Sequence, residues 1–184
     1  MKFEFEKLFF LSFLFLLDLN ALKKFVVIFI FVLIHELTHI FIGKIFGLKT
    51  KKIVFGLFGM HAEIINFDLL ERKKKFLILI SGPLINFLIW FLCKNLFVRQ
   101  INFFIWSINL LPIYPLDGGR IFILILKKFN RANIFFIKFN RVMILFLCLS
   151  GIIFKSLFLF LIGVYLFWLN KILLNKLLFE LYFK

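Results

Sequence analysis

Two histidines and a glutamate stand out because they lie in an apolar run, where ionisable residues are costly. His35, Glu36 and His39 fall within residues 25–46, which are mostly hydrophobic. If this run is helical, the histidines lie at i and i+4 on one face, with Glu36 beside them. Two imidazole nitrogens at this spacing can bind one tetrahedral zinc ion, and the carboxylate can take a proton from metal-bound water. The alternative, two structural histidines without a metal, is disfavoured by the cost of burying ionisable groups in a membrane.

A second carboxylate lies in a segment that predicts a break in a helix. Pro112 and Pro115 precede Asp117, and a pair of glycines follows it. These residues interrupt a helix, and the exposed backbone that results is tolerated in a membrane only where it is buried or borders water. Because a divalent cation removes the cost of burying the charge, Asp117 is a candidate third ligand. In the alternative interpretation, Asp117 only pairs with Arg120 on the next turn.

The composition indicates a polytopic membrane protein. Hydrophobic residues make up 64% of the 184 residues, and 32 residues are phenylalanine. A water-soluble domain of this length cannot bury so much apolar surface. The net charge of +15 does not favour nucleic-acid binding, since the basic residues lie in short runs between apolar spans. There they fit topology signals and contacts with anionic lipid, so we expect the lipid bilayer, and no nucleic acid, as a partner.

The hydropathy pattern predicts six transmembrane helices, at residues 8–19, 25–46, 76–98, 101–126, 134–154 and 156–173. The first is short for a crossing, which needs about 20 apolar residues. In this topology 19 of the 24 lysines and arginines fall on one side, and the positive-inside rule then places both termini in the cytoplasm. We expect an all-α membrane protein with a single domain over residues 1–184.

The connection between the second and third spans does not fit a helix. Residues 53–65 combine β-branched and aromatic residues with glycines, a pattern that predicts a short β-hairpin. His61 lies in this hairpin and is not expected to bind the metal, because the three-ligand set is complete without it.

Three motifs, in this order, resemble the site-2 protease family of intramembrane zinc metalloproteases. They are His35-Glu36-Leu37-Thr38-His39, Ser81-Gly82-Pro83-Leu84-Ile85-Asn86 and Leu116-Asp117-Gly118-Gly119. The longer stretch from Asn109 to Arg120 is most similar to the branch that contains the stage IV sporulation protease, which processes a membrane-associated sigma-factor precursor. Members of that branch commonly carry a CBS domain after the last span. Neither a CBS nor a PDZ domain is expected here.

The resemblance implies roles for the residues of the first and third motifs. His35, His39 and Asp117 would bind one Zn²⁺ per chain, and Glu36 would be the catalytic acid/base. The protein would then be a zinc metalloendopeptidase that hydrolyses a peptide bond in or near the membrane segment of a tethered substrate.

The resemblance also implies how a substrate is held. Asn109, Pro112 and Pro115 would help to place the substrate backbone, and the hairpin edge could bind the substrate as an added strand. Gly82 is expected to allow close packing near the site. For Asn86, a hydrogen bond that holds helices together and a catalytic role both stay open.

Substrates of the expected kind are a sigma-factor precursor or an anti-sigma factor, cleaved in a bacterial or sporulation-related membrane. An inhibitory membrane protein is a further expected partner, and oligomerisation stays open. Two alternatives from other classes use the same scaffold: a non-catalytic membrane binding protein and a metal transporter. Transport without proteolysis would identify the latter.

Overall fold

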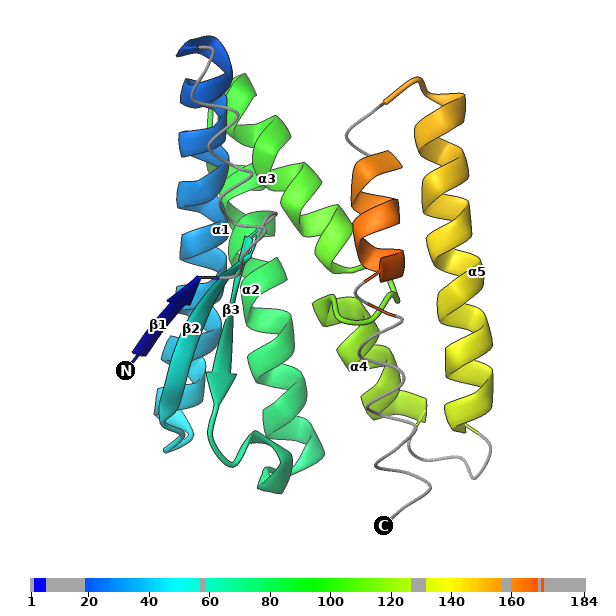
Figure 1. The fold of residues 1–184 in the computed structure, drawn as a ribbon. Helices are drawn as coiled ribbons and strands as arrows, with labels where there is room; N and C mark the ends of the chain where they lie inside the picture. Colours follow the sequence, from blue (N-terminus) through cyan, green and yellow to red (C-terminus); the bar gives the residue numbers. More distant parts are fainter. Residues whose placement is uncertain are drawn as a thin grey trace. The chain divides into compact units, whose positions relative to one another are not determined.

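The computed structural model describes residues 2–5, 19–56, 59–126, 132–156, 160–168 and 170. By its internal contacts the chain divides into two compact units, residues 1–109 and 110–184. The elements follow in the order β1 (Lys2–Phe5), α1 (Leu19–Ile45), β2 (Thr50–Gly56), β3 (Gly59–Ile64), η2 (Phe67–Leu69), α2 (Arg72–Leu92), α3 (Leu96–Asn109), α4 (Asp117–Leu126) and α5 (Ala132–Ile153) (Figure 1). The described chain is mostly helical, as the sequence predicted.

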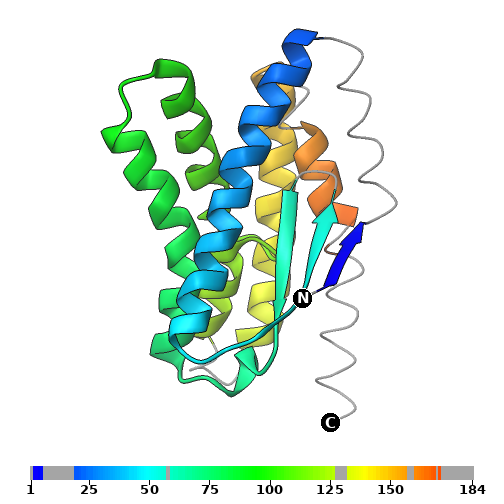
Figure 2. The ribbon, with the colours of Figure 1, turned by 90° about the vertical axis from the view of Figure 1, so that its left-hand side faces the viewer.

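The first unit consists of three packed helices and a small sheet. α1 packs against α2, α2 against α3, and the sheet lies beside α1 through β3 (Figures 1 and 2). Ile40 of α1, Ile78 of α2 and Ile105 of α3 are buried in this unit. The packing brings one face of α1 against α2, and that face carries His35 and His39.

The sheet contains the predicted hairpin and one strand that was not predicted. β2 and β3 are antiparallel, with Val54 opposite His61. β1 pairs in parallel with β2, giving the strand order β1-β2-β3. The all-α expectation was therefore incomplete. A strand of four residues, each paired with a residue 50 positions later, leaves no periodic signal of its own.

An ion-pair network links the outer strands of this sheet. Lys52 Nζ lies 2.6 Å from a carboxylate oxygen of Glu4 and 3.2 Å from one of Glu63. Hydrogen bonding to Glu4, and then to Glu63, raises the pKa of Lys52 above its ordinary value of 10.5. The network therefore stabilises the charged form of Lys52 and connects β1 to β3 across β2.

Only part of the six-span prediction is borne out by the described residues. Two helices, at Leu22–Ile45 and Arg72–Leu92, are long and apolar enough to cross a membrane. The predicted first span, residues 8–19, falls almost wholly outside the described residues. Of the predicted sixth, residues 160–168 are helical.

The predicted fourth span, residues 101–126, is not one helix. It consists of α3, with 14 residues, and α4, with 10 residues, separated by a non-helical loop. At about 1.5 Å per residue each is shorter than the roughly 30 Å hydrocarbon core. The break lies at the prolines, as expected. The third span also ends earlier than predicted, since α2 stops at Leu92 and the side chain of Asn95 accepts a hydrogen bond from Val98 N at the start of α3.

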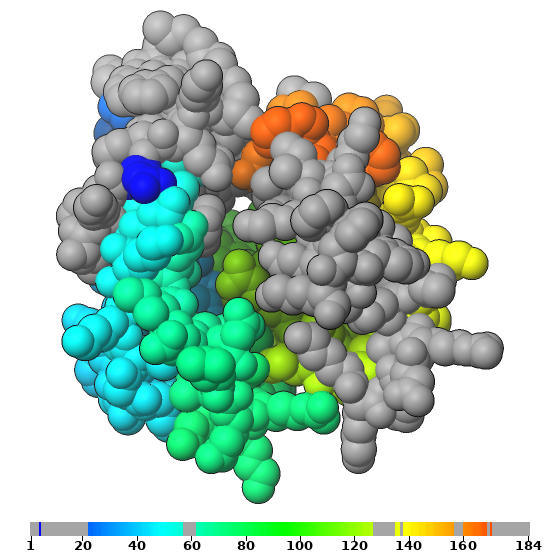
Figure 3. Space-filling model, turned by 60° about the horizontal axis from the view of Figure 1, so that its bottom comes forward, coloured from blue at the N-terminus to red at the C-terminus, as the bar shows by residue number. Residues whose placement is uncertain are grey.

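Basic residues of the first unit are exposed around the sheet and at the start of α2. Lys44, Lys49, Lys51, Arg72 and Lys73 all lie on the surface. Figure 3 shows β2 and the beginning of α2, in cyan and green, on one face of the molecule. Their exposure fits contact with water and lipid headgroups.

Candidate metal centre

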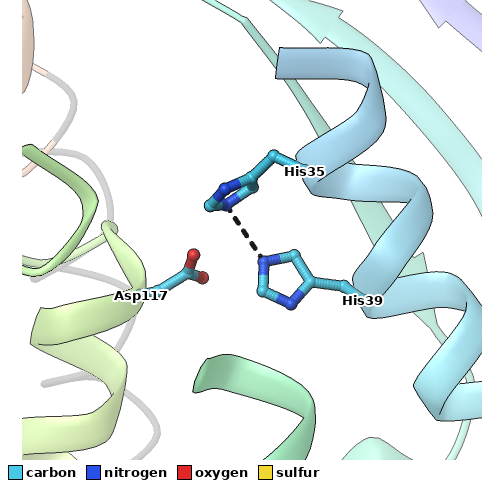
Figure 4. Close-up of side chains that lie close together, drawn as sticks. All are labelled: His35, His39 and Asp117. Atoms are coloured by element: carbon cyan, nitrogen blue, oxygen red, sulfur yellow. Dashed lines mark hydrogen bonds between the residues drawn. The ribbon is translucent and has the colours of Figure 1, made fainter. Parts of the chain in front are cut away.

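Two buried histidines of α1 bring their ring nitrogens together. His35 is 2% exposed and His39 is 6% exposed, and their Nε2 atoms lie 3.2 Å apart (Figure 4). Two nitrogens that share a tetrahedral zinc ion at about 2.0–2.1 Å are separated by roughly 3.3–3.4 Å. The pair therefore has the spacing that one ion requires, as the i, i+4 pattern predicted.

Hydrogen bonds to the other ring nitrogens determine which nitrogen of each histidine can bind a cation. His39 Nδ1 lies 2.6 Å from the carbonyl oxygen of Ile78, and His35 Nδ1 lies 2.6 Å from Oδ1 of Asn86. A carbonyl oxygen only accepts, so each Nδ1 must carry the proton, and in the neutral ring Nε2 then carries a lone pair. Two such lone pairs 3.2 Å apart repel each other unless a proton or a cation lies between them, and a metal ion bound to both nitrogens removes that repulsion.

Gly82 of α2 leaves the space beside these rings. A Cβ at this position would lie 2.4 Å from His39 Nε2 and 2.7 Å from His35 Nε2. The expectation that Gly82 allows close packing was thus correct, but the packing partners are the two ring nitrogens. The Ser-Gly-Pro motif alone does not tell which residues Gly82 contacts, because that depends on which face of α2 packs against α1.

Asp117 belongs to the second unit and is buried at the first residue of α4. The loop before it folds back on the helix start. A Cβ at Gly118 would lie 2.3 Å from the carbonyl oxygen of Leu110, and one at Gly119 would lie 2.4 Å from the carbonyl carbon of Ile113. The glycine pair is therefore required for the close approach of loop and helix.

Two asparagines that the sequence analysis did not single out hold the same loop. Asn140 Oδ1 accepts a hydrogen bond from Tyr114 N at 2.8 Å, and Asn170 Nδ2 donates one to Tyr114 O. Both are almost fully buried. Each is an asparagine within an apolar segment, and a polar residue in such a segment indicates a hydrogen-bonding role.

The remaining predicted residues lie on or between these elements. Glu36 is partly exposed on α1, next to His35. Asn109 is the last residue of α3, and its Nδ2 donates to Ile105 O at 3.0 Å. Pro112 and Pro115 are half-buried in the loop before α4.

Within the described part of the chain, His35 and His39 of the first unit and Asp117 of the second are the candidate metal ligands. Each is buried and offers one nitrogen or oxygen atom as a ligand. Two imidazoles and a carboxylate are a donor set that zinc prefers, and they leave one position for water or substrate.

Known proteins share both the sequence pattern and the fold. The chain is 30% identical to stage IV sporulation protein FB of Bacillus subtilis over a region covering 61% of this chain and 44% of that protein. It is 26% identical to a zinc metalloprotease of Methanocaldococcus jannaschii, over 78% of this chain and 47% of the relative. The chain thus spans about half the length of these curated relatives. No protein-family model matches it.

A solved structure extends the likeness to the fold. The site-2 protease from Methanocaldococcus jannaschii superposes with a TM-score of 0.71 at 23% identity, covering 92% of this chain and 88% of that one. At this identity the likeness shows a shared fold. In sequence the chain is thus similar to a sporulation protein and a zinc metalloprotease, and in fold to a site-2 protease.

Proposed function

We propose that this protein is an intramembrane zinc metalloprotease. The observation that carries the proposal is the pair of buried Nε2 atoms, 3.2 Å apart, on rings whose Nδ1 atoms face acceptor oxygens. This arrangement presents two lone pairs at the spacing of one metal ion. The two long apolar helices that carry the pair and its hydrogen-bond partners support a location within the membrane.

His35, His39 and Asp117 are the proposed ligands. Asp117 adds a negative charge to two neutral rings, which lowers the net charge of a bound divalent cation in an apolar setting. Its place at the first residue of α4 puts it near the positive end of the helix dipole. Bound zinc would act as a Lewis acid on the scissile carbonyl and lower the pKa of the attacking water.

Glu36 is the proposed general base and acid. It follows His35 on α1 and is partly exposed, so it can exchange protons with a reactant while His35 stays buried. Its carboxylate would accept a proton from the attacking water and return it to the leaving amine. Water and substrate would bind at the coordination position that the three proposed ligands leave.

Asn109, Pro112 and Pro115 are proposed to position the substrate. They lie at the end of α3 and in the loop before α4, where backbone is not used in a helix. An extended peptide needs polar partners for its own N–H and C=O groups, and such a loop can supply them.

The sheet supports a second contact with substrate. β1 pairs with one edge of β2, so in the described sheet β3 is the edge strand on the other side. We propose that an extended substrate segment adds to β3. A photo-crosslinker at Glu63 should capture a tethered substrate in the Glu36→Gln background, and one at Lys24, near the beginning of α1, should not.

The proposed substrates are membrane-tethered proteins such as a sigma-factor precursor or an anti-sigma factor, in a bacterial membrane. We further propose a cytoplasmic location for both termini and control by an inhibitory membrane protein. The similarity to a sporulation protein supports this class of substrate. Exposed lysines around the sheet support a cytoplasmic side for that connection.

The decisive experiment is co-expression with tagged single-span precursors. Wild type should cleave a precursor in or near its membrane segment. Glu36→Gln should lower the rate by about 10²–10⁴-fold, because the proton acceptor is lost. Glu71→Gln, at an exposed acid before α2, is the control and should cleave normally.

The zinc content of the same purified proteins separates the proposal from its rivals. Glu36→Gln should retain zinc, since Glu36 is not a proposed ligand. Full cleavage by Glu36→Gln would refute the mechanism. Metal flux without cleavage would favour a transporter, and binding of precursors without cleavage by wild type would favour a non-catalytic binding protein.

A further inference from the structure

A continuous chain of buried hydrogen bonds connects His35 to the backbone of α3. Asn102 Nδ2 donates to Val98 O at 2.9 Å, and Asn86 Nδ2 donates to Asn102 Oδ1 at 2.8 Å. The chain ends at Asn86 Oδ1, 2.6 Å from His35 Nδ1. Both asparagines are 0% exposed. It spans three helices, α1, α2 and α3, all within the first unit.

The direction of every bond in this chain follows from its first member. Val98 O is a backbone carbonyl and can only accept, so the nitrogen of Asn102 must face it. The oxygen of Asn102 then faces Asn86 and requires the nitrogen of Asn86. The oxygen of Asn86 is left for His35, which must place its proton on Nδ1. Thus a carbonyl of α3 determines that His35 Nε2 carries a lone pair.

His39 reaches the same state by a shorter route. Its Nδ1 donates directly to the carbonyl of Ile78, which has no second orientation. An asparagine, by contrast, can present either its oxygen or its nitrogen, so Asn86 alone would allow either tautomer of His35. The two metal-facing nitrogens are equivalent only if something orients Asn86.

We propose that Asn102 is a positioning residue that orients the amide of Asn86 and thereby fixes the tautomer and ring orientation of His35. The identification of the ion as zinc rests on the proposed function. The assignment of the His35 tautomer does not, because it depends only on the hydrogen bonds. Partners of metal-bound histidines generally alter metal affinity by about 10–100-fold. Asn86 contacts His35 directly, whereas Asn102 contacts only Asn86 and acts on His35 by orienting the Asn86 amide.

Imidazole ¹⁵N NMR of the full chain, metal-free in detergent micelles, tests this directly. The chain has only three histidines, which makes assignment by single substitution practical. Wild type should show His35 and His39 protonated at Nδ1. Asn102→Leu should shift His35 to a mixture of tautomers and leave His39 unchanged, because Ile78 O still holds it. His39 is therefore an internal control for folding.

A second substitution tests whether orientation is what Asn102 supplies. Both oxygens of a carboxylate accept hydrogen bonds, so a carboxylate at position 86 can accept from His35 Nδ1 in either orientation. Asn86→Asp combined with Asn102→Leu should restore the Nδ1-protonated form of His35. A role of Asn102 in helix packing alone would not be rescued in this way. If leucine at position 102 prevents folding, the smaller Asn102→Ala replaces it in both proteins.

Zinc affinity of the same variants, measured by chelator competition, gives the second readout. Asn102→Leu should weaken binding by up to about 10-fold and Asn86→Leu by about 10–100-fold. Thr38→Val is the matched control, because Thr38 Oγ1 donates to Ile34 O of its own helix, and it should bind as wild type does.

Two results would overturn the proposal: His35 keeping a single Nδ1-protonated form in Asn102→Leu, or His35 and His39 changing together. If Asn102→Leu changes the tautomer of His35 alone but the wild-type protein binds no zinc, the role of Asn102 stands and the proposed function is rejected.

Discussion

The candidate ligands come from two regions that are built in opposite ways. α1 is a continuous helix of 27 residues, and its regular turn alone places His35 and His39 on one face. Asp117 follows an interrupted segment whose loop folds back on α4 through glycine contacts and asparagine hydrogen bonds. A regular helix thus positions side chains by periodicity. An interrupted segment depends on specific contacts to hold its shape. Substitutions far from Asp117 should therefore affect the position of that ligand more than similar substitutions affect His35 and His39.

The largest expected effect comes from removing the charge contributed by the broken region. Asp117→Asn should reduce zinc affinity by more than about 100-fold, since loss of a ligand exceeds the effect of losing a ligand's partner. Chelator competition on the purified chain measures it. Asp68→Asn, at an exposed acid in η2, is the control. Unchanged affinity in Asp117→Asn would remove Asp117 from the ligand set.

A smaller effect is expected from filling the space beside the histidines. Gly82→Ala places a methyl group within 2.7 Å of both Nε2 atoms, so zinc affinity should fall by at least about 10-fold. Gly43→Ala is the matched control, because its Cβ would meet nothing closer than 3.6 Å. Equal zinc binding by the two variants would show that the rings can move away from α2.

The glycines of the broken region should matter for stability. Gly118→Ala drives a methyl group against the backbone of Leu110, a contact that cannot rotate away, and should destabilise the fold by about 1–3 kcal/mol. Asn140→Leu, which leaves Tyr114 N without its acceptor, should cost about 1–3 kcal/mol as well. Thermal unfolding in detergent measures both. A wild-type melting temperature would mean that the loop does not depend on these contacts.

The smallest effect concerns the sheet beside α1. Because the pKa of Lys52 is raised in the folded protein, its ion pairs stabilise the fold below the ordinary pKa of 10.5. That contribution is lost as the pH rises through the raised value. Melting temperature should therefore fall above pH 10.5 in wild type, and by less in Lys52→Met. Since the pair is exposed, the difference should be small and should shrink in high salt.

Much of the site could be predicted because its signals are local. The spacing of His35 and His39 requires only a helix, and the prolines before Asp117 require only a break. The parallel pairing of β1 with β2, by contrast, joins segments that are distant in sequence, and no local pattern encodes it. The same holds for the hydrogen bonds of Asn86 to His35 and to Asn102, since each joins two different helices.

The sequence by itself determined the chemistry: which side chains could bind a metal, and that they lie in apolar segments. Only the tertiary structure decided which nitrogen of each histidine faces the ion. That choice depends on the carbonyl of Ile78 and on the hydrogen-bond chain from Val98, which packing brings beside the rings. A ring's tautomer is a property of its neighbours in space, and periodicity along one helix carries no information about them.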